Sequence, residues 1–216
     1  MKTVQMKKTA TTLFFLLLAG LAAVPGRAQT ASPATLTPEE RELALKNFQT
    51  TRDNFLKSIA GLSEKQWTFK PAPDRWSVAE VSEHIAVSES TLFGLVQKQI
   101  MSSPATPDKR VQVKGKDEIV LERIPDRSHK AQAPEFLRPK GRWATEADLT
   151  KAFEDSRAAT MEYVRTTNDD LRDHFFDHPV LGTLDGYQWL LLISAHSARH
   201  TAQIEEVKAD PNFPKN

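Results

Sequence analysis

Apolar side chains recur about every 3.6 residues in four separate parts of the sequence, which is the spacing of one face of an α-helix. These parts are residues 37–61, 77–99, 145–167 and 185–207. Little of the remaining sequence has the alternating pattern of a strand. The pattern therefore predicts an all-α fold, a four-helix bundle.

The predicted helices begin at recognisable capping sequences. Thr37-Pro38-Glu39-Glu40 and Ser77-Val78-Ala79-Glu80 are capping boxes, in which a Ser or Thr is followed three residues later by Glu. Asp185 with Gln188 is a variant of the same box, and Gly61 is a suitable end for the first helix. Local sequence alone thus places most of the helix boundaries.

Residues 102–144 interrupt the helical pattern with five prolines and with ten basic against six acidic residues. We expect a long irregular crossover between the second and third helices, with short extended pieces at 111–113 and 118–121. A connection of this length is either a functional segment or a plain bundle crossover, both of which occur.

Residues 1–28 have the layout of a secretory signal peptide. A basic start precedes an apolar run from Leu13 to Val24, and the small residues Gly26 and Ala28 suit a cleavage site before Gln29. The run is shorter than the ~20 residues that span a bilayer, although an uncleaved anchor is the alternative. We expect export, without a stable membrane anchor after cleavage. Residues 29–36 are then a flexible lead-in and 37–214 the folded domain.

Composition narrows the function classes. The 29 basic residues of the chain include four in residues 1–28, which hold no acid, so 25 basic and 28 acidic residues remain after cleavage. Such a balance does not predict a nucleic acid partner, which calls for a basic face. The small net charge causes only weak repulsion between two copies of the chain, and we expect a homodimer. The chain has no cysteine, which excludes disulfides, thiolate nucleophiles and cysteine zinc sites.

Histidines supply the candidate chemistry. His196 and His200 are four residues apart in an apolar helix, so both side chains lie on one face and must find polar partners. A metal ion or ordinary hydrogen bonds would satisfy them. His84 lies on the apolar face of the second predicted helix, where a lone histidine is more often a core residue than a ligand. His174 and His178 share the spacing but adjoin Pro179, so we expect a loop or surface role.

The segment from Trp67 to Ala86, with W-S-V-A-E-V-S-E-H at its end, resembles the second-helix signature of the DinB/YfiT-like superfamily. The segment from Gly182 through H-S-A-R-H to Ile204 resembles the fourth-helix signature of that superfamily, and the resemblance covers essentially residues 37–214. It implies a four-helix bundle in which three histidines bind one divalent metal. By position these ligands are His84, His196 and His200.

Three imidazole ligands leave a position for water, as in catalytic zinc sites, and they suit zinc, nickel, copper or iron. Glu80 and Gln203 are candidates to hold the ligand rings, although Glu80 also fits a plain capping role and Gln203 a plain core-edge role. The first hypothesis is therefore a metal-dependent enzyme, a hydrolase that acts on a small-molecule substrate through metal-activated water. The alternatives are a thiol-dependent transferase or isomerase, which fits poorly with export, and a non-catalytic metal-binding or stress-related module.

Overall fold

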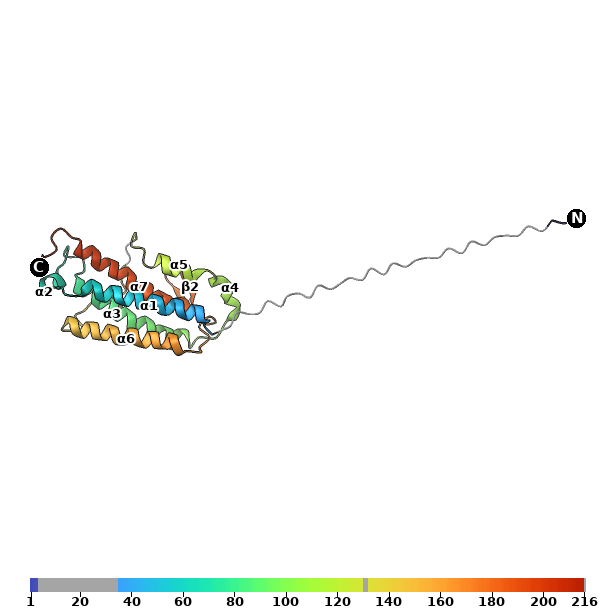
Figure 1. Cartoon of the computed structure of the whole chain (residues 1–216), viewed down its shortest axis with the longest axis horizontal. Helices are drawn as coiled ribbons and strands as arrows, with labels where there is room; N and C mark the ends of the chain where they lie inside the picture. Colours follow the sequence, from blue (N-terminus) through green and yellow to red (C-terminus); the bar gives the residue numbers. More distant parts are fainter. Residues whose placement is uncertain (4–34, 130–131, 216) are drawn as a thin grey trace. The chain divides into compact units, whose positions relative to one another are not determined.

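The computed structural model describes residues 1–3, 35–129 and 132–215 (Figure 1). All the elements below belong to the unit Pro33–Asn216. The predicted signal peptide and lead-in lie almost wholly outside the described residues. Within the described part of the chain, no helix is both long and apolar enough to cross a membrane.

Four long helices form the bundle in the described residues, and each packs against two others (Figure 1). The first, α1, contacts α6 and α7, and α3 contacts the same two helices, so α1 and α3 lie diagonally opposite. The helices are α1 (Pro38–Ile59), α3 (Val78–Leu95), α6 (Glu146–Thr166) and α7 (Gly186–Lys208).

The capping sequences act as predicted. Thr37, Ser77 and Asp185 each accept the backbone N–H three residues later, and the side chain at that third position accepts the N–H of the cap. Each reciprocal pair satisfies two of the backbone donors that a helix start leaves open. At α7 the start is also tied down by its first residue, Gly186, whose N–H donates to the carbonyls of Leu171 and His174. A Cβ at Gly186 would lie 2.9 Å from the Leu171 side chain, so this close approach requires glycine.

A buried ion pair crosses the apolar core. The guanidinium of Arg157 on α6 donates to both carboxylate oxygens of Glu89 on α3, each at 2.7 Å, and neither side chain is exposed. The same guanidinium donates to the Phe48 carbonyl on α1 and to the Ser197 hydroxyl on α7. One side chain therefore bonds to all three of the other long helices.

The crossover between α3 and α6 is more ordered than the sequence analysis predicts. The extended pieces expected at 111–113 and 118–121 belong instead to two short helices, which are separated at Lys114 and Gly115, and Val113 and Val120 are their buried residues. The crossover contains η1 (Val96–Ile100), η2 (Pro107–Lys109), α4 (Arg110–Val113), α5 (Lys116–Arg123) and η3 (Glu135–Leu137), and a short helix α2 (Glu64–Thr68) precedes α3.

The expected loop before the fourth helix is an antiparallel hairpin, so the fold is mostly helical rather than all-α. Strand β1 (Phe175–His178) pairs with β2 (Gly182–Asp185), with Phe175 opposite Asp185 and His178 opposite Gly182. The hairpin turns at Gly182, whose φ of 66° is in the left-handed region that favours glycine. The indole N–H of Trp189 on α7 donates to the Phe176 carbonyl and holds the hairpin against the bundle.

Candidate metal centre

The structure brings the three predicted histidines together. His84 projects from the middle of α3, and His196 and His200 project one turn apart from α7. The Nε2 atom of His84 lies 3.2 Å from the Nε2 atoms of both other rings. One ring nitrogen from each histidine lies within 4.8 Å of the other two, as the sequence analysis expects of a shared ligand set. His84 is buried, whereas His196 and His200 keep part of their surface accessible.

The second ring nitrogens fix which tautomer is present at two of these positions. Nδ1 of His84 lies 2.8 Å from the Leu137 carbonyl, which only accepts, so this nitrogen carries the proton. Nδ1 of His200 lies 2.8 Å from Oε1 of Gln203. That amide oxygen also accepts from Nη1 of Arg127 at 3.3 Å, and the arginine thereby confirms the orientation of the amide.

Two neutral rings with protonated Nδ1 atoms present bare lone pairs at Nε2. The Nε2 atoms of His84 and His200 therefore face each other as two acceptors only 3.2 Å apart, with no proton between them. Two lone pairs that face each other repel, and a cation between them removes this repulsion. The residues present thus fit a divalent metal ion, and imidazole nitrogen is a donor that zinc, nickel and iron all accept.

The surroundings keep these rings neutral. Burial lowers the pKa of His84, although the hydrogen bond with the Leu137 carbonyl opposes this shift. Burial, and then the neighbouring histidines, lower the pKa of His196 and of His200 well below the ordinary value. Metal binding requires unprotonated imidazole, so the same burial that disfavours the imidazolium favours the ligand form.

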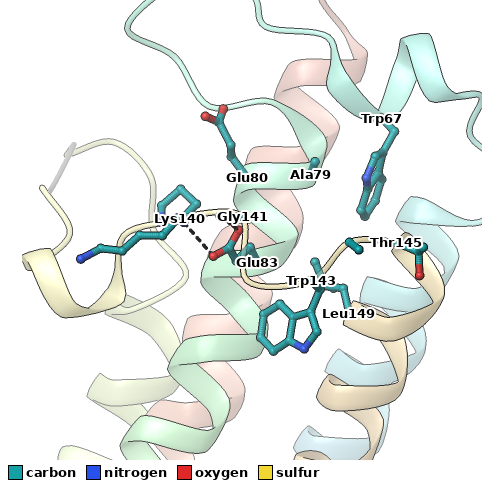
Figure 2. A pocket seen from close by; sticks show the side chains of 11 residues that line it. Trp67, Ala79, Glu80, Glu83, Lys140, Gly141, Trp143, Thr145 and Leu149 are labelled. Carbon is teal, nitrogen blue, oxygen red and sulfur yellow. Dashed lines mark hydrogen bonds between the residues drawn. The ribbon is translucent and has the colours of Figure 1, made fainter.

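The residue next to His84 holds the loop that supplies the Leu137 carbonyl. Figure 2 shows the Glu83 side chain pointing from α3 toward this loop at Lys140 and Gly141. Its carboxylate accepts the backbone N–H groups of Lys140 at 2.7 Å, Gly141 at 2.9 Å and Arg142 at 3.3 Å. The positive φ of Gly141, 71°, lets these successive N–H groups turn toward one acceptor.

Above the histidines lies an open groove of about 1900 Å³, and all three rings are part of its lining. Its walls come from the second half of α3 with η1, from the segment after α5, from η3, from the hairpin and from α7. The described part of the crossover therefore leaves His196 and His200 accessible from the groove.

The other candidates are outside the three-histidine set, although His178 lines the same groove. Nε2 of His174 lies 3.0 Å from Asp170, and Nδ1 of His178 accepts the backbone N–H groups of Val180 and Leu181. Both histidines thus have local roles, as expected, although His178 ends strand β1 and does not lie in a loop. Glu80 caps α3 and pairs with Lys70 at 2.9 Å, so it does not hold a ligand ring. Gln203 holds His200, as predicted.

Sequence reasoning missed the Leu137 carbonyl, the Glu83 carboxylate and the Arg157–Glu89 pair. The first two act through backbone groups more than 50 residues away, and no local pattern reveals such a contact. The buried Arg157 could have been found from the sequence. It follows Leu149 and Phe153 at four-residue spacing, so a charged residue occupies a core position of its helix.

Fold and site together define a four-helix-bundle protein in which three histidines from two helices converge at the floor of a groove. The family model of the DinB superfamily matches residues 47–204, and the chain belongs to this superfamily. The resemblance to DinB/YfiT-like proteins noted in the sequence is thereby confirmed.

Two relatives are similar to the chain over most of their length. The uncharacterized protein YuaE of Bacillus subtilis (strain 168) is 24% identical over 161 residues, which are 74% of this chain and 94% of YuaE. The structure of YfiT from Bacillus subtilis superposes with a TM-score of 0.53 at 14% identity, covering 83% of this chain and 92% of YfiT. YfiT is described as a probable metal-dependent hydrolase with an unusual four-helix bundle topology. At this identity the likeness shows the fold.

Proposed function

We propose that the protein binds one divalent metal ion through His84, His196 and His200 and is a metal-dependent hydrolase of a small-molecule substrate. The facing Nε2 acceptors of His84 and His200, 3.2 Å apart, are the observation that carries the proposal. A divalent ion with three imidazole ligands supplies an open position at which the pKa of water falls to about 7, which provides a nucleophile at neutral pH.

The chain's own residues prepare the ligands. The Leu137 carbonyl and the Gln203 amide oxygen each accept a hydrogen bond from the Nδ1–H of a ligand ring, which aligns the ring and raises its basicity. Arg127 donates to the same amide and pairs with Glu206, so it holds Gln203 in place. The open groove supports a catalytic site over a purely structural one, because a substrate can reach the histidines. The description of YfiT as a probable hydrolase is consistent with this proposal.

Elemental analysis beside an ester hydrolysis assay tests the proposal. We expect about one metal ion per chain, and almost none after His200→Ala. His129→Ala is the matched control, because His129 is exposed and lies outside the three-histidine set, and it should keep the metal. Hydrolysis of 4-nitrophenyl acetate should follow the metal content.

Equal metal content in the parent and in His200→Ala would refute the metal site. Full metal content without hydrolysis of this ester or of longer acyl esters would favour the non-catalytic metal-binding module. The two outcomes are separated because metal content is measured independently of activity.

A further inference from the structure

The floor of the groove is an uncovered part of the apolar core. Leu92, Leu95, Ile124 and Leu181 pack against the main apolar cluster, but each keeps part of its surface open to the groove. They come from α3, from the end of α5 and from the hairpin. Apolar side chains from three elements therefore line the same groove as the three histidines.

The rim of the groove extends this apolar surface. Seven large hydrophobic residues are exposed in the described part of the chain, and three of them line the groove: Phe136 at 60%, Phe176 at 40% and Val180 at 78%. Phe136 lies in η3 and the other two in and beside the hairpin, so exposed apolar groups come from two separate segments. Exposed apolar clusters of this kind mark binding sites.

Basic side chains outnumber acidic ones in the lining. Three of the six cations pair with glutamates outside the lining: Arg75 and Arg127 with Glu206, and Arg138 with Glu135. Lys98 and Arg123 make no ion pair or hydrogen bond with any described residue. The lining cations are Arg75, Lys98, Arg123, Arg127, Arg138 and Arg199, and the lining anions are Asp74, Asp126 and Asp177.

Arg199 adds a positive charge close to the histidines. Its guanidinium donates to the carbonyls of Ile124, Asp126 and His129 and to no carboxylate. These carbonyls orient the guanidinium without neutralising it. A divalent ion at the histidines would add two further positive charges, so the inner end of the groove favours negative charge.

We infer that the groove binds an anionic amphiphile, a small molecule with an apolar chain and a negatively charged head group. This inference rests on the proposed function, because it names the substrate class of the same site. The apolar chain lies along Leu92, Leu95 and Leu181, and the rim residues Phe136 and Val180 cover it. The head group lies toward the positive charges, which places a bond near the head group at the histidines.

Calorimetric titration of the metal-loaded full chain with three probes tests the inference. Decanoate should bind. Decyltrimethylammonium has the same chain and the opposite charge and should bind at least tenfold more weakly, at low salt. Acetate should bind far more weakly, because each buried methylene contributes about fourfold in affinity. Equal affinity for decanoate and acetate would overturn the apolar part, and equal affinity for decanoate and decyltrimethylammonium would overturn the charged part.

The metal-free protein separates this inference from the proposed function. The groove residues remain without metal, so decanoate should still bind, with reduced affinity. Retained binding supports the inference even if no ester is hydrolysed. Complete loss of decanoate binding on metal removal would overturn it, because the ion alone would then account for the carboxylate.

Two pairs of exposed positions provide matched variants. Val180→Asp should weaken decanoate binding about tenfold, whereas Val111→Asp, equally exposed on α4 and outside the groove, should not change it. Lys98→Glu should also weaken binding, and Lys46→Glu on α1 should not. Light scattering of the same variants tests the alternative occupant. A parent dimer that Val180→Asp dissociates would assign this apolar surface to a second copy of the chain and overturn the inference.

Discussion

The Glu83 carboxylate accepts the backbone N–H of Gly141 at 2.9 Å, across 58 residues of sequence. This contact fixes the loop that places the Leu137 carbonyl 2.8 Å from Nδ1 of His84. Glu83 is therefore a positioning residue: it acts on the metal site through a loop and touches no ligand ring.

Replacing Glu83 should weaken metal binding. In Glu83→Gln the amide group offers one acceptor oxygen where the carboxylate offers two, so the loop loses part of its attachment and the Leu137 carbonyl shifts. We expect metal affinity to fall about 10–100-fold, the usual effect of losing an outer hydrogen bond at a metal site. Competition with a chelator measures the affinity, and circular dichroism verifies that the variant is folded.

Glu80→Gln is the control for this experiment. Glu80 lies one turn earlier on the same helix and lines the same pocket as Glu83. Its carboxylate points away from Lys140 and Gly141 in Figure 2, and it bonds to Lys70 and to the start of α3. Its replacement should cost some stability through the lost cap and leave metal affinity unchanged. If both variants bound metal equally well, the loop attachment would have no part in the site.

Metal should be retained below the pH at which ordinary histidines become protonated. Burial lowers the pKa of His84, His196 and His200, so protons compete with metal only at more acidic pH. We expect half of the metal to be released below about pH 6.5, the reference value of imidazole. A colorimetric metal indicator during acidification gives the midpoint. A midpoint above that value would show that the rings are not desolvated as the structure describes.

Breaking the buried ion pair should destabilise the bundle strongly. Arg157→Met leaves the Glu89 carboxylate buried without its cation, which costs about 3–5 kcal/mol in the free energy of unfolding. The double variant Arg157→Met with Glu89→Leu should recover part of this loss, because no charge remains unpaired. Urea denaturation measures both. Arg165→Met, which removes an exposed pair with Glu162, should cost at most about 1 kcal/mol, and a similar loss at both sites would contradict the prediction.

Export remains a prediction on residues 1–28, and it rests on the basic start, the short apolar run and the small residues Gly26 and Ala28. We expect cleavage between Ala28 and Gln29. N-terminal sequencing of the protein purified from its native cell decides the matter. A soluble cytoplasmic chain that begins at Met1 would refute the prediction.

Local signals account for what the sequence could predict. The capping residues Thr37, Ser77 and Asp185 determine helix starts through contacts within four residues, so these boundaries could be read directly. The three histidines were found because two of them share a helix face and the family resemblance supplies the third. The packing of α3 against α7 brings the three histidines together. It is a tertiary contact, which the sequence pattern alone did not show.

Long-range context accounts for the errors. Val113 and Val120 have the β-branched side chains of a strand, but each is buried on a short helix, α4 or α5, where tertiary packing outweighs strand propensity. The hairpin was missed because β1 holds Asp177 and His178, whose polarity hid a strand that is stabilised by pairing with β2.

Of the two hydrogen bonds that hold the ligand histidines, a substitution can remove one acceptor but not the other. Leu137 supplies a main-chain oxygen, which every amino acid at that position would also supply, so substitutions there preserve the acceptor. Gln203 supplies a side-chain oxygen on a partly exposed surface of α7. Glutamate at 203 would place a negative charge behind His200, and an aliphatic residue would remove the acceptor. A single substitution at position 203 can therefore adjust the Lewis acidity of the proposed metal without changing the helix bundle.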